Sequence, residues 1–317
     1  MKHTAHDWLE RYYHYVLLYT KLGCEAKQYL FDRGINEEMM KKFKLGFAPG
    51  DVKPTLGFLK AKGFEFNDLV RDKVLSRFKN GKLTDPFKNR IIFPIQNYAG
   101  QTVAFGGRTL NSSKIKYINT PETDYFIKGD NVYGFHLAKE ETERQGYAIV
   151  FEGYFDAITA HQYGIQNTLA TLGTALTTKQ ALLIKSITPN VVIAFDGDDA
   201  GVESSFKSAS VLNQVGCNVK IAHLINQLDP DDYIKRQGHQ NFMREIALAK
   251  PITESFIDFK RKGHDLTCPT GRYAYAYDVL KEFSTDNPKE LKQVLKSLGM
   301  TLNIPLKIVD ENFVKEG

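Results

Sequence analysis

The sequence predicts an α/β protein with a parallel-sheet core, preceded by an N-terminal mixed α+β subdomain and followed by a C-terminal helical subdomain. After Gly146, short β-branched runs alternate with stretches long enough for helices, which is typical of a parallel sheet with crossover helices. Before that point strand-like runs are joined by a short turn, and beyond Pro251 only helical periodicity remains. We therefore divide the chain into residues 1–146, 147–240 and 241–317.

The N-terminal subdomain is expected to begin with a helix. Apolar and aromatic side chains recur at mostly helical spacing across residues 5–32, and Gly34 then supplies a stop. Residues 82–118 carry two strand-like runs, RIIFPIQ and TVAFGGRTL, separated by the turn-like NYAGQ. This pattern predicts antiparallel strands.

The central subdomain carries four strand-like runs, which are YAIVFEG, NTLATLG, NVVIAFDGD and VKIAHLI. These runs are almost continuously apolar, as expected for parallel strands that are buried on both faces. Helices are expected from about residue 154 and over about 199–215. Past residue 251 the periodicity of ITESFIDFKRK, GRYAYAYDVLKEF and LKQVLKSLGM predicts further helices.

Composition narrows the class of protein. The chain has 317 residues, of which 42% are hydrophobic and 25% charged, so it is an ordinary globular chain rather than a disordered or fibrous one. Its 42 Lys and Arg exceed its 37 Asp and Glu, which permits a basic binding face. Apolar runs are too short to cross a membrane and the N-terminus lacks the features of a secretory signal. We therefore expect a cytoplasmic protein without a membrane partner.

Cysteine spacing and the known motifs exclude other classes. Cys24, Cys217 and Cys268 lie far apart without a CxxC pair, so neither a disulfide framework nor a zinc site is expected in this chain. The sequence contains neither a GxxxxGK[ST] phosphate-binding loop nor a GxSxG motif. We expect neither an ATP-driven motor nor a serine hydrolase.

Acidic side chains cluster at the ends of three expected strands, in EGYFD at 152–156, FDGDDAG at 195–201 and LDPDDY at 228–233. In open parallel sheets, ligands bind outside the carboxyl ends of the strands. Asp196 and Asp198 are two residues apart, so an extended backbone places both side chains on the same side. The sequence therefore predicts a binding site at this edge of the sheet.

A divalent cation is the expected occupant, because clustered carboxylates repel one another unless a cation neutralises them. Mg²⁺ and Mn²⁺ bind carboxylates together with water and substrate phosphates, and the lack of nearby His and Cys argues against zinc. Glu152, Asp229 and Asp231 join the Asp pair as candidate ligands. The alternative is structural, because Asp-Gly-Asp is also common in turns that cap a helix, with Asp199 as the expected cap, and Asp229 can simply start a helix.

These motifs resemble a known family. EGYFDAIT, LATLGTALT, VVIAFDGDDAG and LDPDDY resemble the TOPRIM domain, and their order is specifically similar to bacterial DnaG-type primases. Upstream, AKQYLFDRGI, FKLGFAP, NRIIFPIQNYAGQTVAFGGRTL and KYINTPETDYFIKGDNVYGF look like the N-terminal part of the primase RNA polymerase domain. The resemblance covers at least residues 26–240. It implies a TOPRIM core and the template-directed synthesis of short RNA primers on single-stranded DNA during replication.

The resemblance implies roles at the matching positions only. The implied catalytic and metal-binding acids are Glu152, Asp196 and Asp198. The implied supporting acids are Asp156, Asp229 and Asp231, of which Asp229 and Asp231 are also expected to bind metal. The family's basic groove for nucleotide and nucleic acid maps onto Arg90, Arg108, Lys116 and Lys128, with Asn119 beside it. The implied cofactor is Mg²⁺ or Mn²⁺, with two or more ions. Tyr117, Tyr125 and Phe126 can stack on bases, with burial in the core as the alternative.

The resemblance also implies partners. These are ribonucleoside triphosphates, a single-stranded DNA template, the RNA primer, a replicative helicase reached through a domain not present in this chain, and guanosine alarmones at the nucleotide site. Family members also carry an N-terminal zinc-binding domain and a C-terminal helicase-interacting domain, and neither is readable here. We expect the central polymerase domain of a longer protein, acting at the bacterial replication fork.

Two alternatives stay open. Another TOPRIM enzyme, a nuclease or a topoisomerase, fits the acidic site, although no tyrosine stands in a recognisable nucleophile context. The second alternative is a non-catalytic TOPRIM scaffold that binds DNA. The complete set of Glu152, Asp196 and Asp198 weighs against a scaffold.

Overall fold

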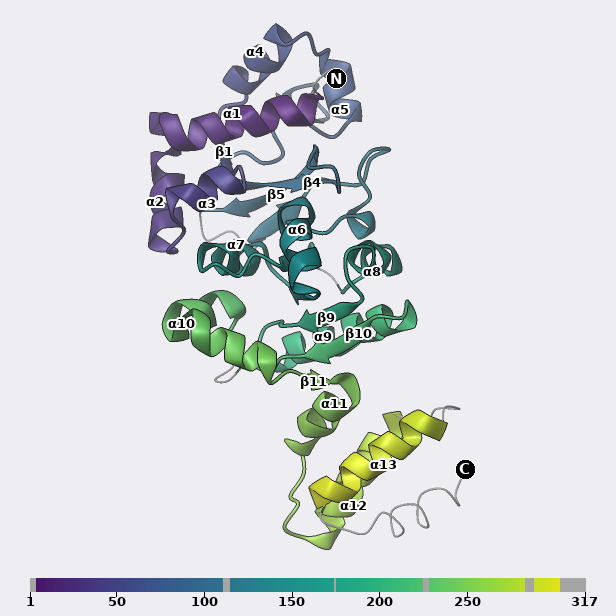
Figure 1. Cartoon of the computed structure of the whole chain (residues 1–317). Helices are drawn as coiled ribbons and strands as arrows, with labels where there is room; N and C mark the ends of the chain where they lie inside the picture. The colour runs from purple at the N-terminus through teal and green to yellow at the C-terminus, as the bar shows by residue number, and fades with distance from the viewer. Residues whose placement is uncertain (1–3, 111–114, 174, 225–227, 283–287, 303–317) are drawn as a thin grey trace.

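The computed structural model describes residues 4–110, 115–173, 175–224, 228–282 and 288–302. Within these residues, three tiers follow the order of the chain, and Figure 1 shows them from top to bottom. An antiparallel sheet with its helices comes first, a second, mostly parallel sheet lies in the middle, and a helical tier comes last. The mixture of helices with a parallel sheet confirms the predicted α/β class.

The first tier contains the elements up to residue 130. Its helices are α1 (Ala5–Tyr19), α2 (Cys24–Asp32), α3 (Glu37–Lys42), α4 (Lys53–Ala61) and α5 (Phe66–Arg71), with short 3-10 turns η1 (Lys21–Gly23) and η2 (Lys128–Asp130). Its strands are β1 (Gly46–Ala48), β2 (Ser76–Arg77), β3 (Leu83–Thr84), β4 (Arg90–Gln96), β5 (Thr102–Thr109) and β6 (Tyr117–Asn119).

The second and third tiers contain the rest of the described chain. Their helices are α6 (Phe135–Gln145), α7 (Tyr154–Gln162), α8 (Thr178–Lys185), α9 (Asp199–Gln214), α10 (Pro230–Ala247), α11 (Ile252–Arg261), α12 (Pro269–Glu282) and α13 (Pro288–Leu302). Their strands are β7 (Ala148–Phe151), β8 (Thr168–Ala170), β9 (Asn190–Ile193), β10 (Asn218–Ile221) and β11 (Lys250–Pro251).

The first sheet is antiparallel, in the order β1-β4-β5-β6. Its central pair, β4 and β5, confirms the antiparallel strands predicted within residues 82–118. Gly106 on β5 lies where a side chain has no room, because a Cβ atom there would be 2.8 Å from the hydroxyl of Tyr154 in the next tier. The glycine therefore lets the second tier pack directly on the first sheet.

The helical prediction for residues 5–32 is wrong at one point. Thr20 is extended (φ −122°, ψ 156°), and this residue separates α1 from η1 and α2. The Thr20 hydroxyl donates a hydrogen bond to the carbonyl oxygen of Val16 over 2.8 Å, so this side chain satisfies one of the last carbonyl groups of α1. Apolar spacing runs through the break, so periodicity alone did not show it.

The second sheet has the order β11-β10-β9-β7-β8, and the pairs β10–β9, β9–β7 and β7–β8 are parallel. Alternate residues of β7 face opposite ways: Ala148 and Val150 pack in one cluster with α8 and α9, whereas Ile149 and Phe151 pack in another with α7 and α10. The predicted parallel sheet with both faces covered is confirmed. All four residues are fully buried.

Both sides of this sheet end in short pairings. The two-residue strand β11 pairs antiparallel with β10, and Tyr133 forms an isolated antiparallel bridge with Ala170 of β8. Helices α11, α12 and α13 then share their own core, which includes Ile257, Tyr275 and Val279. The predicted C-terminal helices are therefore present.

The proposed division at residue 240 stays a prediction. Helix α10 runs across it and is kinked at Gly238, whose φ is 82°. Among the described residues, no helix is both long and apolar enough to cross a bilayer.

Candidate metal and nucleic-acid site

The acidic site is built from three loops that follow β7, β9 and β10 in the second sheet. Glu152 comes directly after β7, Asp196 comes three residues after the end of β9, and Asp229 comes at the start of α10. Together with Asp156 they line one cavity of about 510 Å³, which is within the range of ligand pockets. The predicted site at the carboxyl edge of the sheet is therefore supported by geometry.

Burial, reinforced by repulsion between neighbouring carboxylates, disfavours the charged form of these acids. Burial, together with the charges of Glu152, Asp229 and Asp198, raises the pKa of Asp196 to about 6. Burial and the charge of Asp198 also raise the pKa of Glu152, and burial raises that of Asp229. The carboxylates would therefore be stabilised by a cation, and an all-oxygen set suits a hard ion such as Mg²⁺ or Mn²⁺.

Asp198 both caps a helix and contributes charge to the acidic cluster. Its side chain accepts a hydrogen bond from the Gly201 backbone over 2.8 Å and caps α9. Asp198, rather than the expected Asp199, is thus the helix cap, because the helix begins one residue earlier than that assignment requires. Asp198 is exposed, and its charge acts on both Glu152 and Asp196. The capping and metal-binding interpretations are compatible, since Asp198 uses one oxygen for the cap.

The carboxylate of Asp156 forms hydrogen bonds to two of the acidic loops. Its carboxylate accepts hydrogen bonds over 3.0 Å each from the backbone nitrogens of Gly153 and Asp231. Burial, followed by the charges of Asp196 and Asp229, raises its pKa well above the ordinary value. A Cβ at Gly153 would lie 2.6 Å from the Asp156 carboxylate, so the glycine permits this close approach. Asp156 therefore links the loop after β7 to the start of α10, and its supporting role in catalysis stays a prediction.

Asp229 and Asp231 differ although they are two residues apart. Asp229 lines the cavity and caps α10 by accepting from the Asp232 backbone over 2.6 Å. Asp231 is 1% exposed and forms ion pairs with Arg33 at 2.6 Å and with Lys235 at 2.5 Å. Carboxylate oxygens of Asp229, Asp231 and Asp232 nevertheless lie within 4.8 Å of one another.

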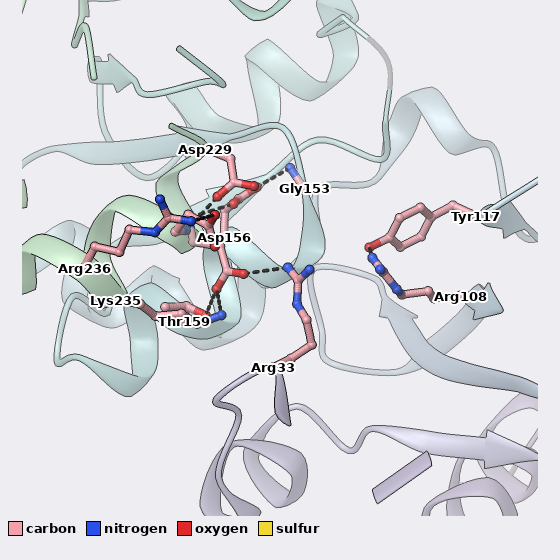
Figure 2. Close-up of polar contacts among 11 residues, drawn as sticks. Arg33, Arg108, Tyr117, Gly153, Asp156, Thr159, Asp229, Lys235 and Arg236 are labelled. Carbon is pink, nitrogen blue, oxygen red and sulfur yellow. Dashed lines mark hydrogen bonds and ion pairs between the residues drawn. The ribbon is translucent and has the colours of Figure 1, made fainter. Parts of the chain in front are cut away.

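The opposite wall of the cavity is basic. Arg108 on β5, Lys116 just before β6 and Asn119 at the end of β6 all line it. The Arg108 guanidinium donates to the Tyr117 hydroxyl over 2.5 Å, and Figure 2 shows this pair across from the acidic loops. The guanidinium carbon also lies 5.4 Å from the ring centroid of Phe155, so aromatic rings fix its position.

Lys128 and Arg90 lie apart from this wall. Lys128 lines a neighbouring groove of about 450 Å³, which shares Tyr117 and Asn119 with the cavity, and burial lowers the pKa of its amine. Arg90 donates instead to the backbone carbonyls of Ile115 and Lys116, over distances of 3.1 to 3.4 Å. Arg90 therefore holds the segment that carries Lys116, and its expected ligand role stays a prediction.

The three aromatic candidates separate clearly. Phe126 is buried in the core, whereas Tyr125 is 70% exposed and Tyr117 lines both the cavity and the groove. Of these three residues, only Phe126 is buried in the core instead of being available to stack on bases. Tyr117 and Tyr125 stay candidates for stacking on bases.

Two of the polar side chains that line the cavity, those of Arg33 and Tyr154, are not among the residues predicted from the sequence. Arg33 follows α2 and reaches the cavity from the first tier, with its guanidinium carbon 4.7 Å from the ring centroid of Phe155. Tyr154 begins α7 and donates its hydroxyl to Asn119 over 2.7 Å. Arg33 lies inside the AKQYLFDRGI segment, but that motif does not indicate which of its side chains reaches the cavity.

Comparison with known families gives two consecutive matches. Residues 13–139 match the family described as DNA primase catalytic core, N-terminal domain, and residues 149–234 match the family described as Toprim-like. The first match covers most of the first tier, and the second covers nearly all of the parallel strands β7 to β10 together with the three acidic segments. The fold and the site thus define a TOPRIM-containing protein with a primase-type N-terminal domain.

Individual relatives agree. A DNA primase from Halalkalibacterium halodurans is 36% identical over 304 residues, covering 94% of this chain and 51% of the relative. The crystal structure of the zinc-binding and RNA polymerase domains of the Aquifex aeolicus primase is 32% identical with a TM-score of 0.79, covering 98% of this chain and 74% of that chain. This chain belongs to the DnaG-type DNA primase family.

A third relative shows the same domain alone. The RNA polymerase domain of Mycobacterium tuberculosis DnaG, solved in complex with a double-stranded DNA oligomer with a 6-nucleotide overhang, is 26% identical with a TM-score of 0.83. It covers 95% of this chain and 97% of that chain. By contrast, the chain spans about half the length of the curated relatives that it matches.

Proposed function

We propose that this chain is the catalytic domain of a primase, which joins ribonucleotides into short RNA primers on single-stranded DNA. The observation that carries the proposal is the meeting of acidic loops from one sheet with Arg108 and Lys116 from the other in a single cavity. Nucleotidyl transfer needs this pairing of carboxylates for metal ions with cations for phosphates.

The acidic wall would hold the metal. Glu152, Asp196, Asp198 and Asp229 are proposed to bind Mg²⁺ or Mn²⁺, in two or more ions. When bound, such ions stabilise the charge on the attacking and leaving oxygens of an in-line displacement. Burial and the repulsion between neighbouring carboxylates together raise the pKa values of Glu152 and Asp196, which supports this assignment, because a bound cation would stabilise the charged form against both effects.

The basic wall would hold the phosphates. Arg108 is fixed between Tyr117 and Phe155, so its guanidinium is oriented before a ligand arrives. Lys116 and Lys128 follow one another along the cavity and the adjoining groove, which suits a nucleotide and a strand bound side by side. The DNA in the M. tuberculosis relative supports a nucleic-acid ligand.

The wider partners belong to the same proposal. A replicative helicase is proposed as a protein partner, and guanosine alarmones would compete at the nucleotide site. A displacement titration tests the latter: bound nucleoside triphosphate should be released by alarmone, and full retention at saturating alarmone would remove that ligand.

The central experiment incubates the protein with single-stranded DNA, labelled ribonucleoside triphosphates and Mg²⁺ or Mn²⁺, and separates the products on a denaturing gel. Glu152→Gln keeps the side-chain size but removes a charge, so it should lose template-dependent RNA. Glu143→Gln, at an exposed position on α6, is the matched control and should retain synthesis.

Other results would favour other functions. Cleavage of the template without RNA would favour a nuclease or topoisomerase, against which the N-terminal match at residues 13–139 already weighs. Intact DNA without RNA, from a folded wild-type protein that binds DNA, would favour a scaffold.

A further inference from the structure

Asp231 is the acidic residue whose surroundings differ from those of its neighbours. Its carboxylate has one oxygen, Oδ1, that accepts from the Thr159 hydroxyl and pairs with Lys235, each at 2.5 Å. The other oxygen, Oδ2, pairs with Arg33 at 2.6 Å. Both oxygens are therefore engaged with donors from the protein, and the side chain is 1% exposed.

The two cations on this carboxylate are not equivalent. Arg33 comes from the first tier, lines the cavity and lies over the ring of Phe155. Lys235 comes from the next turn of α10, and the described lining of the cavity does not include it. Figure 2 shows Arg33 and Lys235 approaching from different sides. Asp231 thus fixes one cation that faces the cavity and one that does not.

Arg33 depends on this contact for its place. Its side chain is 32% exposed, and its Nε atom is buried without a hydrogen-bond partner among the described residues. The ring of Phe155 supports one face of the guanidinium but provides no directional contact. The ion pair with Asp231 is what orients the guanidinium, because a paired carboxylate constrains its direction as stacking cannot.

We propose that Asp231 is a positioning residue, which holds Arg33 across the boundary between the tiers so that the guanidinium meets the phosphates of a bound nucleotide, and that it is not a ligand of the metal. The inference rests on the proposed function. It assigns different roles to the two acids of the Asp-Pro-Asp segment: Asp229 faces the cavity and the metal, and Asp231 faces Arg33.

The test separates metal binding from nucleotide binding. Mn²⁺ affinity is measured from the electron paramagnetic resonance signal of free Mn²⁺, and affinity for a fluorescent ATP analogue is measured at saturating Mn²⁺. Asp231→Asn should weaken nucleotide binding by roughly fivefold or more while changing Mn²⁺ affinity by less than about twofold. Asp229→Asn should show the larger loss of Mn²⁺ affinity.

Matched variants test whether Asp231 affects nucleotide binding through Arg33. Arg33→Met should weaken nucleotide binding as Asp231→Asn does, and the double variant should be no worse than Arg33→Met alone, because Asp231 acts through Arg33. Lys235→Met removes the other cation and should leave nucleotide affinity within about twofold of wild type. Losses that multiply in the double variant would overturn the proposal, as would a loss of Mn²⁺ affinity in Asp231→Asn equal to that in Asp229→Asn.

A second variant keeps the proposal testable if Asp231→Asn does not fold. If Asp231→Asn lacks a cooperative thermal transition, Thr159→Val loosens the same carboxylate without removing its charge. It should weaken nucleotide binding and leave Mn²⁺ binding intact, and the reverse pattern would overturn the proposal. Absence of RNA synthesis by the wild-type protein would count against the proposed function instead, because these binding measurements do not require synthesis.

Discussion

The hydroxyl of Tyr154 donates a hydrogen bond to the side-chain oxygen of Asn119 over 2.7 Å. Tyr154 stands two residues after Glu152 in the acidic turn, and Asn119 ends β6 of the other sheet. Asn119 in turn donates to the carbonyl oxygen of Leu172, in the loop after β8. The acidic and basic walls are therefore held together by a chain of contacts that passes through Tyr154.

Gly106→Ala should disturb this connection. A Cβ at residue 106 would lie 2.8 to 2.9 Å from the hydroxyl and ring atoms of Tyr154, so the ring must shift. We expect a loss of roughly 1–3 kcal/mol in the free energy of unfolding, typical of overpacking, and weaker primer synthesis. Urea denaturation and the gel assay measure the two effects.

Its control is Gly57→Ala on α4, where a Cβ meets nothing within 4 Å. Alanine should stabilise that helix by about 0.5–1 kcal/mol and leave synthesis unchanged. Equal effects of the two substitutions would contradict the packing argument.

The stability of the metal-free protein should depend on pH through Asp196. Burial and neighbouring charges raise the pKa of Asp196 from 3.8 to about 6 in the folded state. When folding raises the pKa of an acid, its protonated form stabilises the folded state. This contribution is complete at pH values below the pKa in the unfolded state, and it is lost as the pH rises through the pKa in the folded state. The thermal midpoint in chelator should therefore fall as pH rises through about 6, and added Mg²⁺ should restore it.

Two variants identify the source of this slope. Asp196→Asn should flatten it, whereas Asp124→Asn, at an exposed position, should keep the wild-type profile. An unchanged slope in Asp196→Asn would assign the effect to other acids, such as Asp156, whose pKa is also raised by burial.

Tyr13→Phe should destabilise the first tier. The Tyr13 hydroxyl donates to the buried carboxylate of Asp85 over 2.5 Å, and the Phe87 backbone donates to its other oxygen over 2.7 Å. Removing one donor leaves a buried acceptor unsatisfied, which costs about 1–3 kcal/mol. Chemical denaturation measures the change, and Tyr15→Phe, on the exposed side of α1, should change stability by less than about 0.5 kcal/mol.

Lys128→Ala should weaken binding of single-stranded nucleic acid. If Lys128 contacts one phosphate along the groove, the slope of log affinity against log salt should become shallower by about one. Fluorescence anisotropy at several salt concentrations gives this slope. Lys139→Ala, at an exposed position on α6, should keep the wild-type slope, and the same slope for Lys128→Ala would remove that lysine from the groove.

The sequence predicts most of the second sheet because its signals are local. Apolar runs, glycines and the acids at strand ends are all read within a few residues, so Glu152, Asp196 and Asp229 could be placed at one edge before any contact was known. The order of the motifs then identified the family, which the comparisons confirm.

Contacts between distant residues could not be predicted in this way. The ion pair of Arg33 with Asp231 joins positions 198 apart in the chain, and no local pattern indicates it. No local pattern indicates the contacts of Arg90 with the backbone carbonyls of Ile115 and Lys116 either, and its role in the groove stays a prediction. The spacing of residues in the sequence also cannot fix a helix start to within one residue, so it did not distinguish Asp198 from Asp199 as the cap of α9.

The short strand β11 has a consequence for the behaviour of the protein in concentrated solution. A strand at the side of a sheet offers unpaired backbone groups to other copies, which can lead to aggregation. Here the outermost strand is two residues long and consists of Lys250, which brings charge, and Pro251, which has no backbone N–H to donate. The pairing that attaches the helical tier therefore also protects this edge of the sheet from pairing with another copy.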